Sequence, residues 1–286
     1  MFLTFQDILM KMQNFWSKNN CLILQPYDLN MGAGTFHPAT AFSMQKDKNW
    51  NAAYIQPSRR PSDGRFANHP NRLQHYYQFQ VVLKLNPFNI QDLYIQSLKN
   101  LAISAEKYDI NFVEDDWKSP TLGASGVGWE VQCNGMEISQ ITYIQKLGSI
   151  PCKPVIGEIT YGMERLALMI QEVENISDII WSVNPKVSYK NIFSSTEEEF
   201  SKFNFDAADT EILKSQFEQI TKECIKLAKE KNLPIVAYDF CIQASNIFNL
   251  LDSRKIFSVS ERERHIEIVR NLSKICVGTS LKKYNQ

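Results

Sequence analysis

Apolar side chains recur every three or four residues between residues 5 and 16, a spacing that predicts an amphipathic helix. Thr4 and Asp7 stand three residues apart at its start, as in a capping box, so we expect them to fix the first turn. A mostly apolar run at 21–25 then predicts a strand that ends at Pro26. The chain is therefore expected to begin with a helix and a strand.

The middle of the chain mixes strand, helix and turn signals. Residues 75–85 are rich in aromatic and β-branched side chains and predict a strand, whereas residues 92–101 predict a short helix. Every glycine except Gly278 lies between Gly32 and Gly162, so turns are concentrated in this part. A body that mixes strands and helices is therefore predicted for the first half.

Asn134 and Gly135 form the dipeptide best suited to a type I′ turn, so residues 129–145 predict an antiparallel hairpin. Side chains directly opposite each other in a regular hairpin share a face, which puts Glu130 and Glu137 on one face. The pairs expected from the turn outward are Cys133 with Met136, Gln132 with Glu137, Val131 with Ile138, Glu130 with Ser139, and Trp129 with Gln140.

The last third of the chain has helical spacing almost throughout. Residues 210–231 and 234–251 each predict a long helix, and Ser260 with Glu263 resembles a capping box that opens a final one. Residues 184–195 are the expected linker, because the composition changes there. These patterns together predict an α+β fold whose C-terminal region is helical.

Composition and charge exclude several classes of protein. The 286 residues are 44% hydrophobic and 22% charged, which is typical of a globular chain. The 31 basic residues equal the 31 acidic ones, so contact with nucleic acid must come from a local patch or a partner. No apolar run reaches the roughly 20 residues of a membrane helix. Polar residues also interrupt the N-terminus too often for a signal peptide, and a cytoplasmic protein without membrane contact is expected.

The six cysteines are widely separated and include no C-x-x-C pair, so we predict neither a zinc site nor a disulfide framework. Reduced, buried thiols are expected instead. The cysteines are Cys21, Cys133, Cys152, Cys224, Cys241 and Cys276.

Arginine is rare before residue 250, although lysine is common there. A guanidinium group grips phosphate or carboxylate through two parallel hydrogen bonds and stacks on planar rings, so arginine retained in a lysine-rich chain indicates planar recognition. A solvated basic loop is the structural alternative for the first three. The five arginines are Arg59, Arg60, Arg65, Arg72 and Arg165.

Two further segments contain candidate binding residues. His75 and Phe79 are four apart in a predicted strand and so share a face on which a base could stack; a core position for Phe79 is the alternative. Residues 157–165 predict a glycine-containing turn from a strand into a helix, with Arg165 in the first turn. Neither G-x-G-x-x-G nor the P-loop pattern occurs, which argues against a Rossmann or P-loop site.

These segments resemble the three motifs of class II aminoacyl-tRNA synthetases. The first helix and strand resemble motif 1, the segment from Arg60 through His75-x-x-x-Phe79 resembles motif 2, and residues 157–165 resemble motif 3. Over nearly the whole chain, the sequence is similar to the α-subunit family of bacterial heterotetrameric glycyl-tRNA synthetases. The stretches that match most closely are 32–38, 54–64, 71–79, 112–117 and 157–165.

The resemblance implies a six- or seven-stranded antiparallel sheet flanked by helices. Together with the change in composition, it predicts a catalytic domain at 1–184 and a helical domain for partner docking at 185–286. It also implies an α–α homodimer within an α2β2 tetramer, whose β subunit recognises tRNA. The implied activity is that of a glycine–tRNA ligase. ATP and Mg²⁺ would convert glycine to glycyl-adenylate, and glycine would then pass to tRNA(Gly) with the help of the β subunit.

The motif positions assign residues to ATP. Arg60 is expected to hold the α-phosphate and the glycine carboxylate, while Phe79 and Arg165 are expected to enclose the adenine ring. Glu137 corresponds to the acidic residue near ATP and the metal ion, and the catalytic set is Arg60, Glu137 and Arg165. The further residues expected around ATP are Arg59, Arg65, Arg72 and His75.

The glycine pocket leaves alternatives open. Glu130 or Glu158 is expected to hold the ammonium group, and Trp129 with Gln140 to form a wall. In a regular hairpin, Trp129 and Gln140 point away from the face of Glu130 and Glu137, so only one pair can line the pocket. The full set expected to bind glycine is Arg60, Gln78, Trp129, Glu130, Gln140, Glu158 and Thr160.

Two other functions remain open at this stage. One is a different ATP-dependent carboxylate ligase on the same fold, and the other is a non-catalytic relative. Arg60, Phe79 and Arg165 together favour an enzyme, because a binding module has no need of a bidentate phosphate grip.

Overall fold

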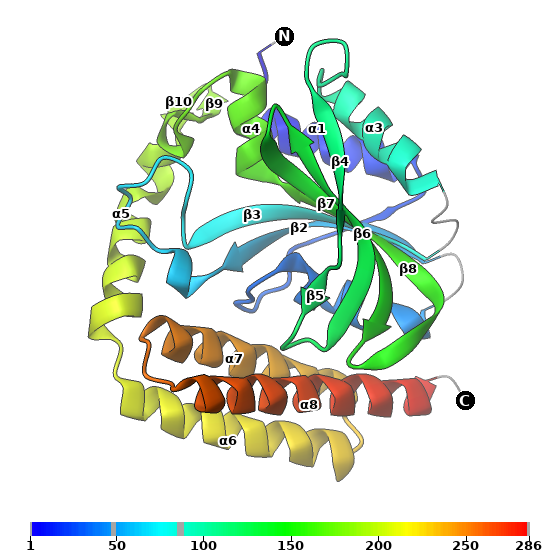
Figure 1. Cartoon of the computed structure of the whole chain (residues 1–286), viewed down its shortest axis with the longest axis vertical. Helices are drawn as coiled ribbons and strands as arrows, with labels where there is room; N and C mark the ends of the chain where they lie inside the picture. The colour runs from blue at the N-terminus through cyan, green and yellow to red at the C-terminus, as the bar shows by residue number, and fades with distance from the viewer. Residues whose placement is uncertain (1, 47–49, 85–88, 285–286) are drawn as a thin grey trace.

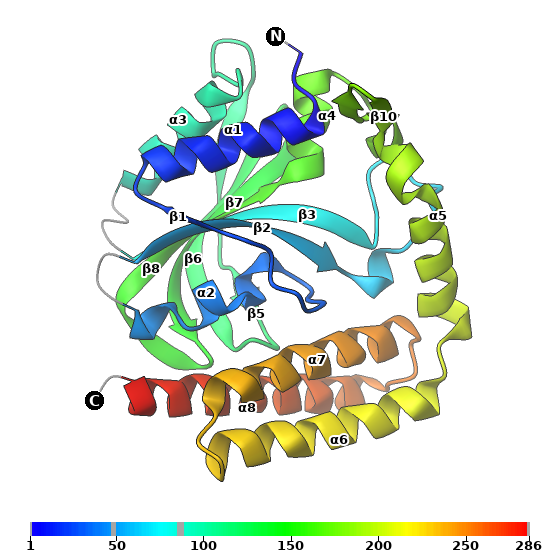
Figure 2. The ribbon, with the colours of Figure 1, turned by 180° about the vertical axis from the view of Figure 1, so that it is seen from behind.

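The structure is a computed structural model that describes residues 2–46, 50–84 and 89–284, and it confirms the predicted α+β fold. One large twisted sheet lies in the middle of the molecule (Figure 1). Helices α1, α3 and α4 cover one face of the sheet, and a bundle of α6, α7 and α8 lies against the other (Figures 1 and 2). No helix among the described residues is long and apolar enough to cross a membrane.

The strands and helices have the following bounds. The strands are β1 (Leu22–Leu24), β2 (Asn51–Arg59), β3 (His75–Leu83), β4 (Ile110–Asp115), β5 (Lys118–Ser119), β6 (Ala124–Cys133), β7 (Met136–Leu147), β8 (Ile150–Gly162), β9 (Ile180–Val183) and β10 (Lys186–Ser188). The α-helices are α1 (Phe5–Lys18), α2 (Pro38–Ala41), α3 (Ile90–Asn100), α4 (Met163–Gln171), α5 (Tyr189–Lys202), α6 (Thr210–Lys229), α7 (Pro234–Ser253) and α8 (Val259–Tyr284). Short helical turns are η1 (Gly34–Phe36), η2 (Ser43–Gln45), η3 (Pro61–Asp63), η5 (Ile176–Asp178) and the π-helical η6 (Phe203–Ala207).

In the described part of the chain the main sheet has eight strands, in the order β1-β2-β3-β8-β7-β6-β4 with β5 also paired to β6. The expected six or seven strands therefore become eight. β1 pairs with β2 in parallel, whereas the other neighbours are antiparallel. Strands β3, β8 and β7 lie together at the centre, so side chains from three separate segments meet on one surface.

The predicted start of the chain is confirmed. Asp7 N–H donates to Thr4 Oγ1 at 3.2 Å, and Thr4 N–H donates to Asp7 Oδ2 at 3.0 Å, which completes the capping box. The apolar stripe of α1 is buried at Phe5, Ile8, Met12 and Trp16. These side chains pack against the face of the sheet that also carries Phe79 and Tyr161.

Two predictions about the second half are wrong. Residues 184–195 are not a linker, because they form the turn between β9 and β10, then β10 and the first half of α5. The cap of α8 is Ser258 rather than Ser260: Ser258 N–H donates to Glu261 Oε2 at 2.8 Å, and Glu261 N–H donates back to Ser258 Oγ at 3.3 Å. The same three-residue spacing occurs twice, two residues apart, and the earlier copy forms the cap.

The hairpin is present, but its register changes after two pairs. Cys133 faces Met136 and Gln132 faces Glu137 as predicted, and an extra residue in β7 then shifts the ladder. The later predicted pairs are therefore wrong, since Val131 faces Ser139, Glu130 faces Gln140 and Trp129 faces Ile141.

The C-terminal helices share a hydrophobic core with the sheet. Side chains of α6, α7 and α8 cluster with Tyr54, Val82 and Ile144 of the sheet, and Tyr238 Oη donates to Phe36 O at 2.9 Å. The boundary expected after residue 184 falls in the turn between β9 and β10. All six cysteines are buried and free, as expected.

We predict that a chain ending at Ser188 will not fold, because removing α5 to α8 uncovers the core residues on that face of the sheet. Thermal unfolding followed by circular dichroism is expected to show no cooperative transition for the truncated chain. A cooperative transition in that chain would instead establish an independent domain that ends near residue 184.

Candidate active site

A cavity of about 400 Å³ opens over β3, β8 and β7. It lies on the face of the sheet that is turned toward the C-terminal bundle, since Tyr76 and Gln78 share that face of β3 with Val82. Half of the residues predicted for the site line this cavity. They are Arg60, Arg72, Gln78, Glu137, Gln140, Thr160 and Arg165.

Strand alternation decides which side chains of β3 reach the cavity. Tyr76 and Gln78 line it, whereas Phe79 points to the opposite face, where it is fully buried with its ring 6.2 Å from that of Tyr161. The sequence-based assignment of Phe79 to the adenine site is therefore corrected to a core position. Tyr76 was missed, although Arg72-x-x-x-Tyr76 repeats the basic-to-aromatic spacing of His75-x-x-x-Phe79.

Arg60 and Tyr76 are fixed around one backbone carbonyl. Arg60 Nε donates to Gly32 O at 3.3 Å, and Tyr76 Oη donates to the same oxygen at 3.3 Å. The Arg60 guanidinium carbon lies 5.3 Å from the centre of the Tyr76 ring, within the range of a cation–π contact. The loop at Gly32 thus holds a cation and an aromatic plane at the cavity wall.

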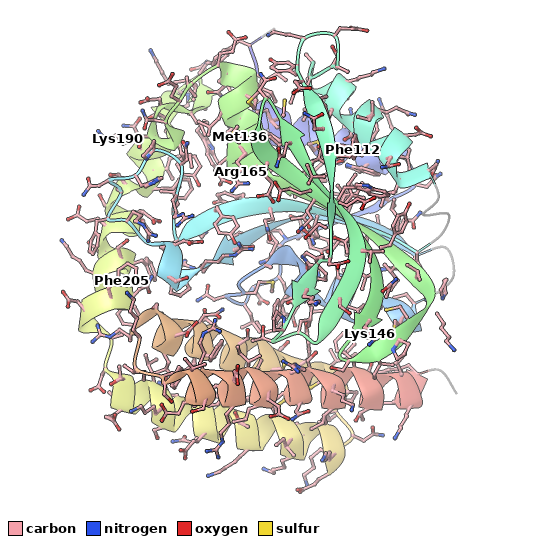
Figure 3. The ribbon with its side chains drawn as sticks, viewed as in Figure 1. Phe112, Met136, Lys146, Arg165, Lys190 and Phe205 are labelled. Carbon is pink, nitrogen blue, oxygen red and sulfur yellow. The ribbon has the colours of Figure 1, made fainter. Side chains whose placement is uncertain are left out.

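Arg165 lies in the first turn of α4, as predicted, above β3 in the view of Figure 3. Its Nη1 donates to Glu137 Oε2 at 2.6 Å and to Glu137 O at 2.8 Å. The two side chains are 43% and 39% exposed, so this ion pair orients the guanidinium and contributes little to stability. Arg72 and Asp63 also line the cavity, with Arg72 Nε 4.0 Å from Asp63 Oδ1.

Besides Phe79, three more of the predicted ATP residues lie outside the cavity. Arg65 Nη1 donates to Ser62 O and Gly64 O of its own turn, at 3.0 and 2.6 Å. The Arg59 guanidinium lies 4.3 Å from the centre of the Phe200 ring. His75 packs against Tyr77 and Phe193, and burial, together with the charge of Arg59, lowers its pKa to about 4. These placements correct the assignments of Arg59, Arg65 and His75 to ATP, because β-strand alternation and local turns direct them elsewhere.

The bulge in β7 resolves the question of the hairpin faces. Glu137 and Gln140 are three residues apart and would point to opposite faces of a regular strand, but the extra residue brings both to the cavity. Gln140 Nε2 donates to Asp115 Oδ2 at 2.6 Å. Glu137 from one predicted pair and Gln140 from the other therefore line the cavity, and neither pair lines it as a whole.

The other two hairpin residues lie elsewhere. Trp129 packs against Phe112 and Tyr143 on the far face, so its assignment to the pocket wall is corrected. Glu130 faces Gln140 across the ladder, one strand beyond the cavity lining, and accepts a hydrogen bond from Gln132 Nε2 at 2.9 Å. Glu130 is thus beside the cavity without lining it.

A buried polar group continues the floor of the cavity beyond Thr160. Glu158, two residues earlier on the same face of β8, is 2% exposed. Thr35 Oγ1 donates to Glu158 Oε2 at 3.1 Å, and Gln80 Nε2 donates to Thr35 Oγ1 at 3.1 Å. Among the residues that the structure describes, neither Glu158 Oε1 nor Gln80 Oε1 has a hydrogen-bond partner. Burial, which penalises the charged form, raises the pKa of Glu158 to about 7.

Within the described residues, no group of three or more His, Cys, Asp or Glu side chains is placed to hold a metal ion. Glu137 offers one carboxylate to the cavity. Glu164 also lines it, but this carboxylate accepts from Tyr77 N–H and Tyr189 Oη, both at 2.8 Å. A metal ion here would need most of its ligands from a substrate and water, as Mg²⁺ usually does at phosphate sites.

Comparison with known proteins identifies one matching family. The family described as glycyl-tRNA synthetase alpha subunit matches residues 5–285. Proteins named glycine–tRNA ligase alpha subunit from Rickettsia bellii (strain OSU 85-389) and Rickettsia canadensis (strain McKiel) are each 53% identical over 277 residues, with 96% of both chains covered. A solved structure of a pyrrolysyl-tRNA synthetase from Desulfitobacterium hafniense aligns with a TM-score of 0.42 and 11% identity, over 61% of this chain and 69% of that chain.

We predict that Glu158 makes the unfolding free energy depend on pH. Its pKa is raised from 4.5 to about 7 in the folded state, so the folded protein holds this proton more tightly than the unfolded chain does. The stability that this group contributes is complete below pH 4.5 and is lost as the pH rises toward 7, by about 1.4 kcal/mol per pH unit.

Urea unfolding of the parental protein and of Glu158→Gln at pH 5 and pH 7.5 measures this effect. The parental protein is expected to lose more stability across this interval than the variant, which has no proton to release. Equal pH dependence of the two proteins would contradict the assigned burial of the carboxyl group.

Proposed function

Because the chain belongs to the glycyl-tRNA synthetase α-subunit family and is thus part of an aminoacyl-tRNA ligase, we propose that its cavity activates glycine with ATP. The observation that carries the proposal is the meeting of Arg60, Arg72 and Arg165 around one cavity whose wall includes the Tyr76 ring. Guanidinium groups and an aromatic plane are the chemistry that binds phosphates and a base.

ATP would lie with its adenine on Tyr76. Arg165 is the cation on the other side of the base, held by its contacts with Glu137. Arg60 is assigned to the α-phosphate and the glycine carboxylate, and Arg72 to the outer phosphates. This arrangement keeps the roles predicted for Arg60 and Arg165 and replaces Phe79 by Tyr76.

The first step joins two anions. A carboxylate oxygen of glycine attacks the α-phosphorus of ATP, a new P–O bond forms, and the bond to the β-phosphate oxygen breaks to release pyrophosphate. Arg60 would neutralise the charge that gathers on the α-phosphate oxygens. Its hydrogen bond to Gly32 O orients the guanidinium before that charge develops. No nucleophilic side chain is required.

Glu137 is the residue that would hold Mg²⁺, because its carboxylate lines the cavity and Mg²⁺ commonly binds one or two carboxylates together with substrate phosphates. When bound, the ion would supply positive charge to the phosphate oxygens. The protein's own part is to fix Glu137, which it does through the bulge in β7 and the contact with Arg165.

Glu158 is the better of the two candidates for the glycine ammonium group. Neither residue is among those that line the cavity. Glu158, next to Thr160 on the same face of β8, has an oxygen without a hydrogen-bond partner among the described residues and a raised pKa, both of which a cation would relieve. Glu130 already accepts from Gln132 and lies on β6, one strand beyond the cavity lining. Thr160, Gln78 and Gln140 would surround the substrate on the same face of the sheet.

Selection for glycine must work by exclusion, because glycine has no side chain to grip. The loop at Gly34 lies against β3: Gly34 N–H donates to Gln78 Oε1 at 2.8 Å, and a Cβ at Gly34 would lie 2.9 Å from Gln80 Oε1. Little free space therefore remains between the Gly34 loop and the floor of the cavity. A substrate methyl group would overpack it, at a cost of about 1–3 kcal/mol.

In the second step a ribose hydroxyl of tRNA attacks the carbonyl carbon of glycyl-adenylate, an ester bond forms, and the bond to the phosphate oxygen breaks to release AMP. An α subunit implies a partner subunit for this step. We assign tRNA(Gly) binding mainly to a β subunit within an α2β2 tetramer, since the formal charge of this chain is zero. The α–α contact is assigned to α1 and the free edge of β1, where Met10 and Leu22 are 54% and 53% exposed. We place the complex in the cytoplasm, with no membrane partner.

The role of Arg60 can be tested by Arg60→Lys. The variant keeps the charge but loses the two-pronged grip, so glycine-dependent exchange of pyrophosphate into ATP is expected to fall about 10²–10³-fold. Arg65→Lys is the matched control, because the guanidinium of Arg65 donates to carbonyls of its own turn outside the cavity. Exchange by Arg60→Lys at the parental rate would exclude this role.

A second test distinguishes Tyr76 from Phe79 as the residue of β3 that contacts the adenine. Tyr76→Ala is expected to raise the KM for ATP about tenfold, since stacking of a base on an aromatic ring contributes about 1–3 kcal/mol. Phe79→Ala is expected to lower the free energy of unfolding by about 3–5 kcal/mol and to leave the KM for ATP near the parental value. The reverse pattern, with ATP affinity lost in Phe79→Ala alone, would return the adenine site to Phe79.

A further inference from the structure

The loop between β2 and β3 carries two of the arginines assigned to ATP and cannot hold its shape by itself. It contains Phe66 and Ala67, two consecutive residues with positive φ, 54° and 58°. This conformation is unfavourable for residues that have a Cβ, so contacts from outside the loop must maintain it. Those contacts determine where Arg60 and Arg72 lie.

One face of α5 supplies these contacts. Phe193, Glu197, Phe200 and Ser201 have the i, i+4, i+7 and i+8 spacing of a single helical face. The helix runs down one side of the molecule, from the β9–β10 hairpin to the C-terminal bundle, and Figure 3 labels Phe205 just beyond its end. Helix α5 lies outside all three motifs of the resemblance.

Glu197 is the central contact. It is 2% exposed, and Gln74 N–H donates to its Oε1 at 2.6 Å. The carbonyl of the same Gln74 accepts from Arg60 N–H at 2.8 Å. A continuous path of two hydrogen bonds thus joins the carboxylate of Glu197 to the backbone of Arg60.

The rest of the face contacts the loop at Phe66 and Gly64, and it contacts the end of β2 at Arg59. Ser201 Oγ accepts from Phe66 N–H at 3.0 Å, at the first of the two strained residues. A Cβ at Gly64 would lie 2.8 Å from Ser201 Oγ and 3.0 Å from the Phe205 ring, so loop and helix are in close contact. Arg59 adds its guanidinium, 4.3 Å from the centre of the Phe200 ring.

We propose that α5 is the element that positions the ATP-binding loop, and that Glu197 is its main positioning residue. Without Glu197, the Gln74 N–H loses its acceptor and Arg60 loses its fixed backbone, so the loop holds the ATP-competent shape for only part of the time. The apparent affinity for ATP falls in proportion to that fraction. This inference rests on the proposed binding of ATP by Arg60 and Arg72.

Glu197→Ala tests the proposal in the full-length chain co-purified with its β subunit. If the loop of this variant holds the ATP-competent shape for about one-tenth of the time, the KM for ATP in pyrophosphate exchange rises about tenfold. The KM for glycine is expected to change less. Glu197→Gln keeps an oxygen that can accept from Gln74 N–H and is expected to restore most of the affinity. Glu198→Ala is the matched control, because Glu198 is 52% exposed and pairs with Lys202 on the same helix.

A purely structural role gives a different result. Loss of folded protein lowers kcat and leaves both KM values unchanged, and that outcome, or a parental KM for ATP in Glu197→Ala, overturns the proposal. Measuring Arg60→Lys in the same assay distinguishes failure of the positioning role from failure of the proposed ATP site. If Arg60→Lys impairs exchange and Glu197→Ala has a parental KM for ATP, the positioning role of α5 is rejected and the proposed ATP site stands. If Arg60→Lys exchanges pyrophosphate at the parental rate, the proposed ATP site itself is rejected.

If Glu197→Ala fails to fold, Gly64→Ala carries the test, because it leaves the buried carboxylate in place. The added methyl group pushes the loop away from Ser201 and Phe205, while Gly64 has an ordinary negative φ of −53° that alanine can adopt. The KM for ATP is expected to rise here as well. An unchanged KM for ATP in a folded Gly64→Ala protein overturns the proposal.

Discussion

Side chains on a β-strand alternate between two faces, and here both faces of the sheet are covered by helices. Phe79, Val81 and Leu83 of β3 are therefore buried on the side of α1, whereas Tyr76 and Gln78 lie on the other side and form a polar surface. Antiparallel pairing places Thr160 and Gln140 beside them on β8 and β7. The candidate site depends on this alternation, since one shift of register would exchange the polar row for the core.

The same constraint explains which predictions from the sequence succeeded. Helix spacing, the capping box at Thr4 and the strand-to-helix turn before Arg165 are local features, and the structure contains them. The arginines of the cavity were found because their rarity is visible in the sequence. The face of the sheet on which each side chain lies was harder to predict. The bulge in β7 that brings Glu137 and Gln140 together has no sequence signal. The spacings Arg72-x-x-x-Tyr76 and His75-x-x-x-Phe79 overlap, which made Phe79 as good a candidate as Tyr76.

Long-range contacts could not be predicted at all. Glu197 and Gln74 are 123 residues apart, and nothing in the sequence indicates that a carboxylate on α5 accepts from the residue just before β3. The C-terminal helices approach the site from a second direction through α7, where Tyr238 bonds to Phe36 O and the Asn249 amide would lie 3.2 Å from a Cβ at Gly32. The region after residue 188 therefore supports the cavity as well as being a candidate for partner docking.

The most direct test of the proposed activation site is a crystal structure of the protein with a non-hydrolysable analogue of glycyl-adenylate. We expect the adenine ring against Tyr76 with Arg165 on its other side, the phosphate mimic at Arg60, and the ammonium group at Glu158. An analogue bound away from this cavity, or an adenine ring that leaves Tyr76 uncontacted, would contradict the central claim that this face of the sheet is the activation site.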